Sequence, residues 1–232
     1  DVVGGAMARD LENLQDRLPP FPQAQAETVI VTAFDKPVAE VFASFGESVA
    51  AASIAQVHRA EVATDGERKT VAVKVLRPNV GGRFQRDLSD FMFAARKVEA
   101  LSSEARRLRP IEIVDTLARS VAMEMDLRLE AAALSEMAEN TRDDHEFRIP
   151  TVDWDRTSHH VLTMEWIDGI ALNDRAKLEA AGIDLPDLGR KVIQNFLRHA
   201  LRDGFFHADM HPGNLFVDET GRLVAVDFGI MG

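Results

Sequence analysis

The stretch His207-Ala-Asp-Met-His-Pro-Gly-Asn214, followed by Asp227-Phe-Gly229, decides how the fold of this chain is interpreted. Asp209 and Asn214 stand five positions apart. This is the spacing at which a catalytic loop of phosphoryl-transfer enzymes presents an acceptor-orienting aspartate and a metal-binding asparagine. Asp227 is the acidic residue expected to hold magnesium against nucleotide phosphates. The pattern therefore predicts a phosphoryl-transfer site.

The two histidines of this stretch allow a second interpretation. His207 and His211 flank Asp209, and a His-x-Asp-x-His cluster can also hold a metal ion. The phosphoryl-transfer interpretation is favoured because it alone also explains Asn214 and Asp227. Asp209 is then the candidate general base or acceptor-orienting residue.

The composition is that of a globular protein. The chain has 232 residues, of which 46% are hydrophobic and 28% charged, so it can bury a substantial core. It contains no cysteine, which excludes disulfides and thiolate metal sites. No apolar run approaches the roughly 18 residues of a membrane span.

The charge is unevenly distributed. A net charge of −11 argues against general nucleic-acid binding. Residues 66–109 nevertheless carry 11 Lys/Arg against 5 Asp/Glu. This segment is either a solvated helix face or a patch that meets anionic lipid or an acidic partner.

Hydrophobic periodicity and turn residues predict alternating groups of helices and strands. Helices are expected over residues 6–17, 22–32, 36–43, 84–108, 110–141 and 186–204, the last ending at Gly204. Strands are expected within residues 49–62 and over 70–76, 150–152, 160–164, 215–217 and 223–226, with a hairpin turn at Asp65-Gly66. The order predicts an α+β fold with a domain boundary near 167–171.

A lysine in an apolar strand supplies another part of the expected site. In Val71-Ala-Val-Lys74, the lysine could reach nucleotide phosphates while an acid holds it in place, or it could simply snorkel to solvent. Glu124, Asp126 and Glu130 are the candidate acids, with Asp126 and Glu130 expected on one helix face. An exposed acidic helix face is the alternative for these three residues.

An alanine-rich segment occupies the position of a glycine-rich phosphate loop. Ala50-Ala-Ala-Ser-Ile-Ala-Gln56 lies between two strand-like pieces, where it could cover a nucleotide. Alanine permits a tight turn but disfavours positive φ, so close backbone approach to phosphate is restricted. By itself, such a run is also typical of the start of a packed helix.

In five segments the chain resembles the UbiB family of atypical, protein-kinase-like proteins. The resemblance spans nearly the whole chain and rests on Ala50–Gln56, Val71–Lys74, Glu124-x-Asp126-x-x-x-Glu130, His207–Asn214 and Asp227–Gly229. Each motif is weak alone, but the ordered set is specific. The Lys-x-Gly-Gln motif usual in the family is not matched upstream.

The resemblance implies a two-lobed, protein-kinase-like α+β fold with extra N-terminal helices. Residues 1–45 would form the helical extension, 46–167 the N-lobe with an inserted helix, and 168–232 a C-lobe truncated after the Asp-Phe-Gly motif. Because the chain stops at Gly232, the apolar face of helix 186–204 is expected to lack its usual cover. Reduced stability or self-association is the predicted consequence.

The resemblance also implies roles for individual residues. Lys74 would contact phosphates and pair with Glu130, and Asp209 would be the catalytic aspartate. Asn214 and Asp227 would be the magnesium ligands. The residues expected around the rest of the nucleotide are Glu124 and Asp126 of the Glu-x-Asp pair, backbone groups of Glu165 and Ile167 at the hinge, and the covering segment Ala50, Ala51, Ala52, Ser53, Ile54, Ala55, Gln56 and Val57.

The function implied is that of a Mg-ATP-binding atypical kinase or ATPase that supports ubiquinone biosynthesis at the cytoplasmic face of a membrane. Its expected partners are ATP, Mg²⁺, anionic lipid and ubiquinone-biosynthesis proteins, and not nucleic acid. One alternative is a small-molecule phosphotransferase of the aminoglycoside or choline kinase type, which lacks the alanine-rich loop and the Glu-x-Asp helix. The other is an ATP-binding pseudokinase scaffold, against which Lys74, Asp209, Asn214 and Asp227 argue.

Overall fold

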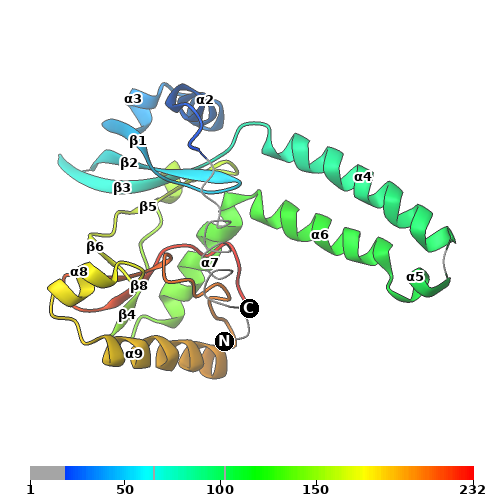
Figure 1. The fold of residues 1–232 in the computed structure, drawn as a ribbon. Coiled ribbons are helices and arrows are strands. Elements are labelled where there is room, and N and C mark those ends of the chain that lie inside the picture. The colour runs from blue at the N-terminus through cyan, green and yellow to red at the C-terminus, as the bar shows by residue number, and fades with distance from the viewer. Residues whose placement is uncertain (1–18, 65, 102) are drawn as a thin grey trace.

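The computed structural model describes residues 19–64, 66–101 and 103–232. The helix expected over residues 6–17 lies outside this part of the chain. Two sheets with their covering helices form an upper and a lower lobe, and a long helical hairpin projects from one side (Figure 1). The mixture of helices and sheets confirms the expected α+β class.

The upper lobe is an antiparallel sheet covered by two helices. Its strands lie in the order β1 (Ser44–Ala51), β2 (Ala55–Thr64), β3 (Glu67–Leu76) and β5 (Val161–Glu165), and the helices are α2 (Gln23–Phe34) and α3 (Val38–Val41). Thr64 pairs with Glu67, and Gly66 takes a φ of 82° between them, while Asp65 lies outside the described residues. This confirms the expected turn, for which glycine tolerates the positive φ.

The alternation of side chains along β3 explains where Lys74 lies. Successive residues of a strand point to opposite faces of the sheet. Val71, Val73 and Val75 pack with Ile30 of α2 in the core of the upper lobe. Lys74 therefore points to the opposite face, toward the lower lobe, where its ammonium is only partly exposed.

Within the described residues, four helices stand where the sequence predicted two continuous ones, over residues 84–108 and 110–141. The structure has α4 (Val80–Leu101), α5 (Ser103–Arg107), α6 (Pro110–Glu124) and α7 (Leu127–Asn140). Helices α4 and α6 lie side by side and extend away from the lobes, while α7 enters between the two sheets (Figure 1). The 84–108 helix begins earlier than expected and is divided near its end.

A capping aspartate divides the helix expected over residues 110–141, so that expectation is wrong. Asp126 has an extended backbone, and its carboxylate accepts the N–H of Arg128 at 3.1 Å. This is the geometry of an N-cap, in which the side chain satisfies a free N–H of the first turn. The expected shared helix face of Asp126 and Glu130 is likewise wrong, because Asp126 precedes α7.

The lower lobe contains a second sheet. Its strands lie in the order β4 (Phe147–Arg148), β8 (Leu223–Ala225), β7 (Leu215–Asp218) and β6 (Gly169–Ala171), with β4 and β8 parallel. The strand expected over 150–152 is wrong, since only Val152 forms an isolated bridge, to Met164. The expected division at residue 167 stays a prediction. β4, which precedes this residue in the chain, pairs with β8, which follows it.

Helices α8 (Arg175–Ala180) and α9 (Leu185–Arg198) complete the lower lobe. The helix expected over 186–204 is confirmed, except that its last turn, 199–203, is π-helical and ends at Gly204 with a φ of 63°. Ile193, Leu197 and Leu201 on this helix are exposed. The self-association expected from this apolar face stays a prediction.

Two apolar cores hold the lobes. One lies between the upper sheet and α2, with Ile30 and Phe42 fully buried. The other joins α7 to both sheets, with Leu134, Leu162 and Leu223 buried. Because α7 contributes to the second core, the lobes are packed around the same helix that carries Glu130.

Asp218 is an acid-sensitive support of the lower sheet. Its carboxylate accepts hydrogen bonds from the N–H groups of Thr220 and Arg222 and from the guanidinium of Arg148. Burial alone would raise the pKa of Asp218, but these donors lower it to about 2. The carboxylate therefore stabilises the fold above the unfolded pKa, near 4, and this contribution is lost as the pH falls toward 2.

We expect Asp218→Asn to lower the free energy of unfolding at pH 7 by about 2 kcal/mol. Urea unfolding at pH 7 and pH 3.5 measures the difference from the unmodified protein, which should shrink at the lower pH. Glu219→Gln, at the exposed neighbouring position, is the control and should have little effect. A loss of equal size at both pH values would contradict the ionic role of Asp218.

Candidate active site

A cavity of about 430 Å³ lies between the two lobes. Its walls come from the alanine-rich segment, from β3, from the connection that follows β5, and from the loop and strand ends of the lower lobe. The lining residues are Val49, Ala50, Ala51, Ala52, Ala55, Gln56, Val57, Ala72, Lys74, Met164, Trp166, Ile167, Gly213, Asn214, Phe216, Val226 and Asp227. The volume is in the range of small-molecule sites.

An ion-paired cluster borders this cavity, which two of its members, Lys74 and Asp227, line. The Lys74 ammonium lies 2.8 Å and 2.9 Å from the two carboxylate oxygens of Glu130, and 3.3 Å from Oδ2 of Asp227. The side chain of Glu130 is 6% exposed, whereas that of Asp227 is 44% exposed. Of the three candidate acids, Glu130 is thus the one that holds Lys74, as the resemblance implied.

Two carboxylates share one ammonium, and their pKa values move apart. Burial and the nearby charge of Asp227 raise the pKa of Glu130 above that of a free carboxyl, although Lys74 opposes this. Burial also acts to raise the pKa of Asp227, but Lys74 and the N–H of Gly229 hold it below its ordinary value. Burial would lower the pKa of Lys74, yet the two carboxylates raise it, so the lysine stays charged.

The loop 207–214 is fixed by its own polar groups. Nδ1 of the buried His207 accepts the N–H of Asp209 at 3.1 Å. The side-chain amide N–H of Asn214 donates to Oδ2 of Asp209 at 3.2 Å, and the backbone carbonyl of Asn214 accepts the N–H of Val226. These bonds bring Asp209, Asn214 and the segment leading to Asp227 together, as the motif spacing predicts.

The alternative metal site has no support in this geometry. His207 and His211 use Nδ1 to accept backbone N–H groups two residues ahead, of Asp209 and Gly213. Burial lowers the pKa of His207, so its imidazole is neutral. Within the residues that the structure describes, no group of three or more His, Asp or Glu side chains could hold a metal.

The alanine-rich segment forms a turn between β1 and β2. The N–H of Ala52 donates to the carbonyl of Ala55 at 2.8 Å, which closes the turn. Most of the segment lines the cavity, but Ser53 and Ile54 do not. Ser53 is exposed, and Ile54 packs against the core instead.

Gln56 has a structural contact that the sequence did not indicate. Its buried amide accepts the N–H of Phe21 at 3.0 Å and donates to the Phe21 carbonyl at 3.3 Å. It also contacts Nε2 of His58 at 2.8 Å, and Nδ1 of His58 contacts the Gly46 carbonyl at 2.9 Å. Gln56 thus ties the covering segment to the chain that precedes α2.

Arg77 is a second supporting residue that sequence reasoning missed. Its backbone N–H donates to the Ile54 carbonyl at 2.7 Å, and its guanidinium donates to the carbonyls of Ala52 and Pro19, both at 3.0 Å. The guanidinium also lies over the ring of Phe21. An arginine that follows a strand is common, so only its tertiary contacts identify this role.

The expected hinge residues are placed differently from each other. Ile167 lines the cavity with Met164 and Trp166. Glu165 does not line it, because its carboxylate pairs with Arg148 at 2.9 Å and its N–H donates to the Thr151 carbonyl. The backbone contact of Glu165 with a nucleotide base stays a prediction.

Glu124 and Asp126 face a different space. They line a second cavity of about 630 Å³ together with Glu130, Phe228 and Gly229, rather than the cavity that contains Lys74. The carboxylate of Asp126 is also paired with Arg128 at 2.7 Å. Contact of this acidic pair with the nucleotide therefore stays a prediction.

Comparison with known proteins fits this geometry. The family of the ABC1 atypical kinase-like domain matches residues 13–232. The chain belongs to this family. A protein of Marinobacter nauticus described as a probable protein kinase UbiB is 41% identical over 237 residues, covering all of this chain and 43% of the relative.

A relative from Xanthomonas euvesicatoria with the same description is 39% identical over 241 residues, and the alignment again covers 43% of it. These matches confirm the resemblance to the UbiB proteins. The ABC1 chain thus spans less than half the length of these curated relatives.

A solved structure supports the same conclusion for the fold. The complex of Rv3197 with erythromycin from Mycobacterium tuberculosis superposes with a TM-score of 0.75 at 30% sequence identity. The match covers 99% of this chain and 56% of that one. It confirms the kinase-like α+β fold expected for this ABC1 chain.

Proposed function

We propose that this ABC1 chain binds Mg-ATP and forms the catalytic site of an atypical kinase or ATPase. The observation that carries the proposal is the cluster in which Glu130 holds Lys74 beside Asp227, on the border of a cavity walled by both lobes. A charged lysine, fixed by an acid and close to a second carboxylate, suits the binding of nucleotide phosphates and their metal.

Each side of the cavity suits a different part of the nucleotide. Val57, Ala72 and Met164 offer apolar surface to an adenine ring. Asn214 and Asp227 offer one amide and one carboxylate oxygen donor, which suits Mg²⁺ because this ion is usually held by few protein oxygens together with phosphates and water. When bound, the ion supplies positive charge that neutralises the phosphates.

Asp209 is the residue proposed to act on the phosphoryl acceptor. It is exposed, and the amide of Asn214 fixes one of its carboxylate oxygens. A hydroxyl or water that donates to the other oxygen would be oriented for attack and could pass its proton to the carboxylate. Lys74 would remain charged throughout, because both neighbouring carboxylates favour its protonated form.

The covering segment favours ATPase-type turnover over ordinary protein phosphorylation. Among the described residues, none of Ala50–Gln56 has a positive φ, so this turn lacks the backbone geometry that glycines give a phosphate loop. Phosphates would therefore be held chiefly by Lys74 and the metal. A calorimetric titration with ATP tests the proposal: affinity should depend on magnesium, and magnesium-independent binding would contradict it.

The description of the relatives as probable protein kinase UbiB supports a role in ubiquinone biosynthesis. A location at the cytoplasmic face of a membrane, with proteins of that pathway as partners, is proposed from the family resemblance. ATP turnover with and without liposomes and a quinone-precursor mimic tests this role. Binding without any turnover would instead favour the pseudokinase scaffold. In the described residues, none of the helices is both long and apolar enough to span a bilayer.

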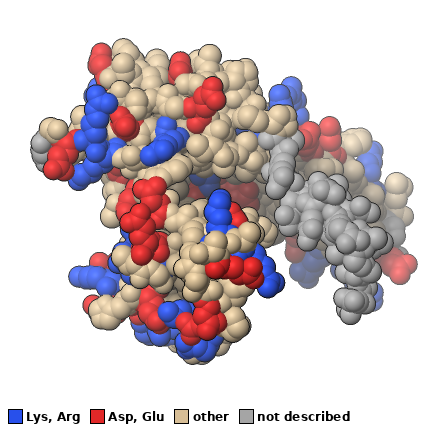
Figure 2. Space-filling model, turned by 60° about the vertical axis from the view of Figure 1, so that its left-hand side comes forward, with Lys and Arg blue, Asp and Glu red and all other residues tan. Residues whose placement is uncertain are grey.

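The hairpin tip is the part of the segment 66–109 that best suits an anionic lipid surface. Lys74 and Arg77 of that segment are used in the cavity and its support, so they are not part of a surface patch. At the tip, Arg106 and Arg107 in α5 follow Leu101, which is 85% exposed. Figure 2 shows basic and acidic side chains interspersed on the lobes, without a field of one sign on that face.

We expect Arg106→Glu combined with Arg107→Glu to reduce flotation with vesicles that contain anionic lipid, because it replaces attraction by repulsion. Arg175→Glu combined with Lys177→Glu in α8 changes the charge equally, away from the hairpin, and serves as the control. Binding should weaken with added salt. Equal flotation with neutral and anionic vesicles would contradict the lipid proposal.

A further inference from the structure

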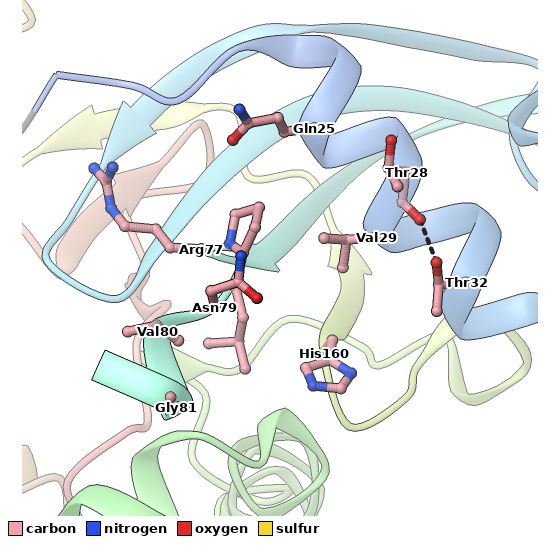
Figure 3. A pocket seen from close by; sticks show the side chains of 12 residues that line it. Gln25, Thr28, Val29, Thr32, Arg77, Asn79, Val80, Gly81 and His160 are labelled. Atoms are coloured by element: carbon pink, nitrogen blue, oxygen red, sulfur yellow. Dashed lines mark hydrogen bonds between the residues drawn. The ribbon is translucent and has the colours of Figure 1, made fainter. Parts of the chain in front are cut away.

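A further cavity, of about 460 Å³, lies on the upper lobe between α2 and the turn from β3 to α4. It shares no lining residue with the cavity that contains Lys74. Figure 3 shows side chains from one side of α2 facing those of the turn, with His160 on a neighbouring segment. The volume is sufficient for a small molecule.

The upper sheet covers one face of helix α2, and the adjoining, mainly polar face lines the cavity. Ala26 and Ile30 are fully buried against the sheet. Gln25, Val29 and Thr32 follow helical spacing on the adjoining face and line the cavity. On this face Gln25 and Thr32 are exposed, whereas Val29 is half-buried and also packs against the core of the upper lobe.

The opposite wall is held in a fixed shape. Pro78 restricts the backbone, and Asn79 takes a φ of 59°, which reverses the chain before α4 begins. The N–H of Leu76 donates to the His160 carbonyl at 3.0 Å, which fixes the segment of His160 that forms the third wall of the cavity. The cavity is therefore formed by regular elements rather than by a long loop.

The polar groups of this cavity suit a neutral ligand. The side-chain amides of Gln25 and Asn79 make no hydrogen bond with the described residues, so both can donate and accept. Among residues 19–64, 66–101 and 103–232, no acidic side chain lines the cavity, and the one cation that does, Arg77, directs its guanidinium to the carbonyls of Ala52 and Pro19. Burial and the neighbouring His159 lower the pKa of His160, which leaves that imidazole neutral.

The lining also includes apolar side chains, beside the exposed residues Gln25 and Asn79. Val29, Leu76 and Val80 contribute side chains from three elements, and the stem of Arg77 adds a fourth. A flat apolar ring fits such walls, and a carboxamide on it can pair with the amides of Gln25 or Asn79 in donor–acceptor fashion. A carboxylate on the same ring would lose solvation without meeting a free cation.

Arg77 connects this cavity to the alanine-rich segment Ala50–Gln56, most of which lines the cavity proposed to bind the nucleotide. Its stem lines the cavity, while its backbone N–H and guanidinium hold the carbonyls of Ile54 and Ala52. A ligand that packs against the stem would restrict the motion of Arg77 and, with it, the turn over the nucleotide cavity. Coupling of this kind is reciprocal, so nucleotide and ligand would strengthen each other's binding.

We propose that the cavity between α2 and the β3–α4 turn is an effector site for a small neutral ligand with an apolar ring and a carboxamide. Its occupancy tightens nucleotide binding through Arg77. The coupling rests on the proposed nucleotide site, whereas binding of the ligand does not. The two parts are therefore tested separately.

Benzamide is the probe for the site, measured by saturation-transfer NMR, and benzoate is the charged counterpart. We expect benzamide to bind and benzoate to bind far more weakly. Thr32→Trp, which fills the cavity, should abolish the benzamide signal, and Val31→Trp, one position away on the same helix and exposed outside the cavity, should retain it. Equal signals from the two tryptophan variants, or equal binding of benzoate, would overturn the proposed site.

Asn79→Gly is a second probe that preserves the turn. Glycine accepts the positive φ of this position, so the variant removes the amide without straining the backbone. Benzamide affinity should fall several-fold. Unchanged affinity would show that Asn79 does not recognise the ligand and would overturn the predicted carboxamide preference.

ATP affinity with and without saturating benzamide tests the coupling. We expect a gain of about five-fold or more, the lower end of allosteric coupling. Arg77→Met keeps an apolar stem but loses the bonds to Ala52 and Pro19, so it should bind benzamide without any gain in ATP affinity. A persistent gain in this variant, or none in the unmodified protein, would overturn the coupling. Absence of ATP binding under all conditions would instead refute the proposed function.

Discussion

Replacing Asp227 by asparagine is expected to weaken Mg-ATP binding by about 100-fold or more. Even the residues that support metal ligands contribute about 10- to 100-fold, and here a charged ligand itself would be removed. Asparagine matches aspartate in size, and its oxygen can still accept the Gly229 N–H that Oδ1 accepts at 3.1 Å. The loss would therefore reflect the missing charge rather than a misfolded turn.

Asp209→Asn is the matched comparison for Asp227→Asn. Asp209 is assigned to the acceptor and not to the metal, so this variant should keep Mg-ATP affinity while turnover falls by about 10²- to 10⁴-fold. Calorimetric titrations with ATP, with and without magnesium, measure affinity, and phosphate release measures turnover. Unchanged Mg-ATP affinity in Asp227→Asn would refute the metal role of this residue.

Replacing Glu130 by leucine is expected to lower the free energy of unfolding by about 3 kcal/mol, as is typical when one partner of a buried ion pair is removed. Lys74 would then retain only the contact with Asp227, at 3.3 Å, while its side chain is 12% exposed. Urea unfolding followed by circular dichroism measures the loss.

The double variant Lys74→Met with Glu130→Leu distinguishes the loss of the ion pair from a loss of side-chain packing. Two apolar side chains of similar volume leave no unpaired buried charge, so much of the stability should return. ATP affinity should stay low in both variants, because the phosphate-binding lysine is absent or displaced. A double variant as unstable as Glu130→Leu would indicate that packing, rather than charge, explains the loss.

Local patterns predicted those parts of the fold that depend on local chemistry. The hairpin turn at Asp65-Gly66 was predictable because few residues accept the required φ. The strand expected over residues 70–76 was likewise predictable from its alternation, and the structure places Lys74 on the face of that strand opposite the core. The division between α6 and α7 was missed, because apolar spacing continues through Asp126, and its capping role depends on a local backbone bend.

The sequence by itself determined the chemistry available to this ABC1 chain. The spacing from Asp209 to Asn214, together with Asp227, defines a phosphoryl-transfer motif because those few side chains are needed at nearly fixed separations along one loop. Lys74 was recognisable for a similar reason, because a charged residue is unusual within an apolar strand.

Only the tertiary structure decided which groups meet. From the residues alone, three acids could have held Lys74. The family resemblance implied Glu130, and the packing of α7 between the sheets brings it there, while Glu124 and Asp126 line a separate cavity. The contacts of Gln56 with Phe21 and of Arg77 with Ala52 join segments far apart in sequence. Spacing along the chain carries no information about such contacts, because they form only when separate elements are packed together.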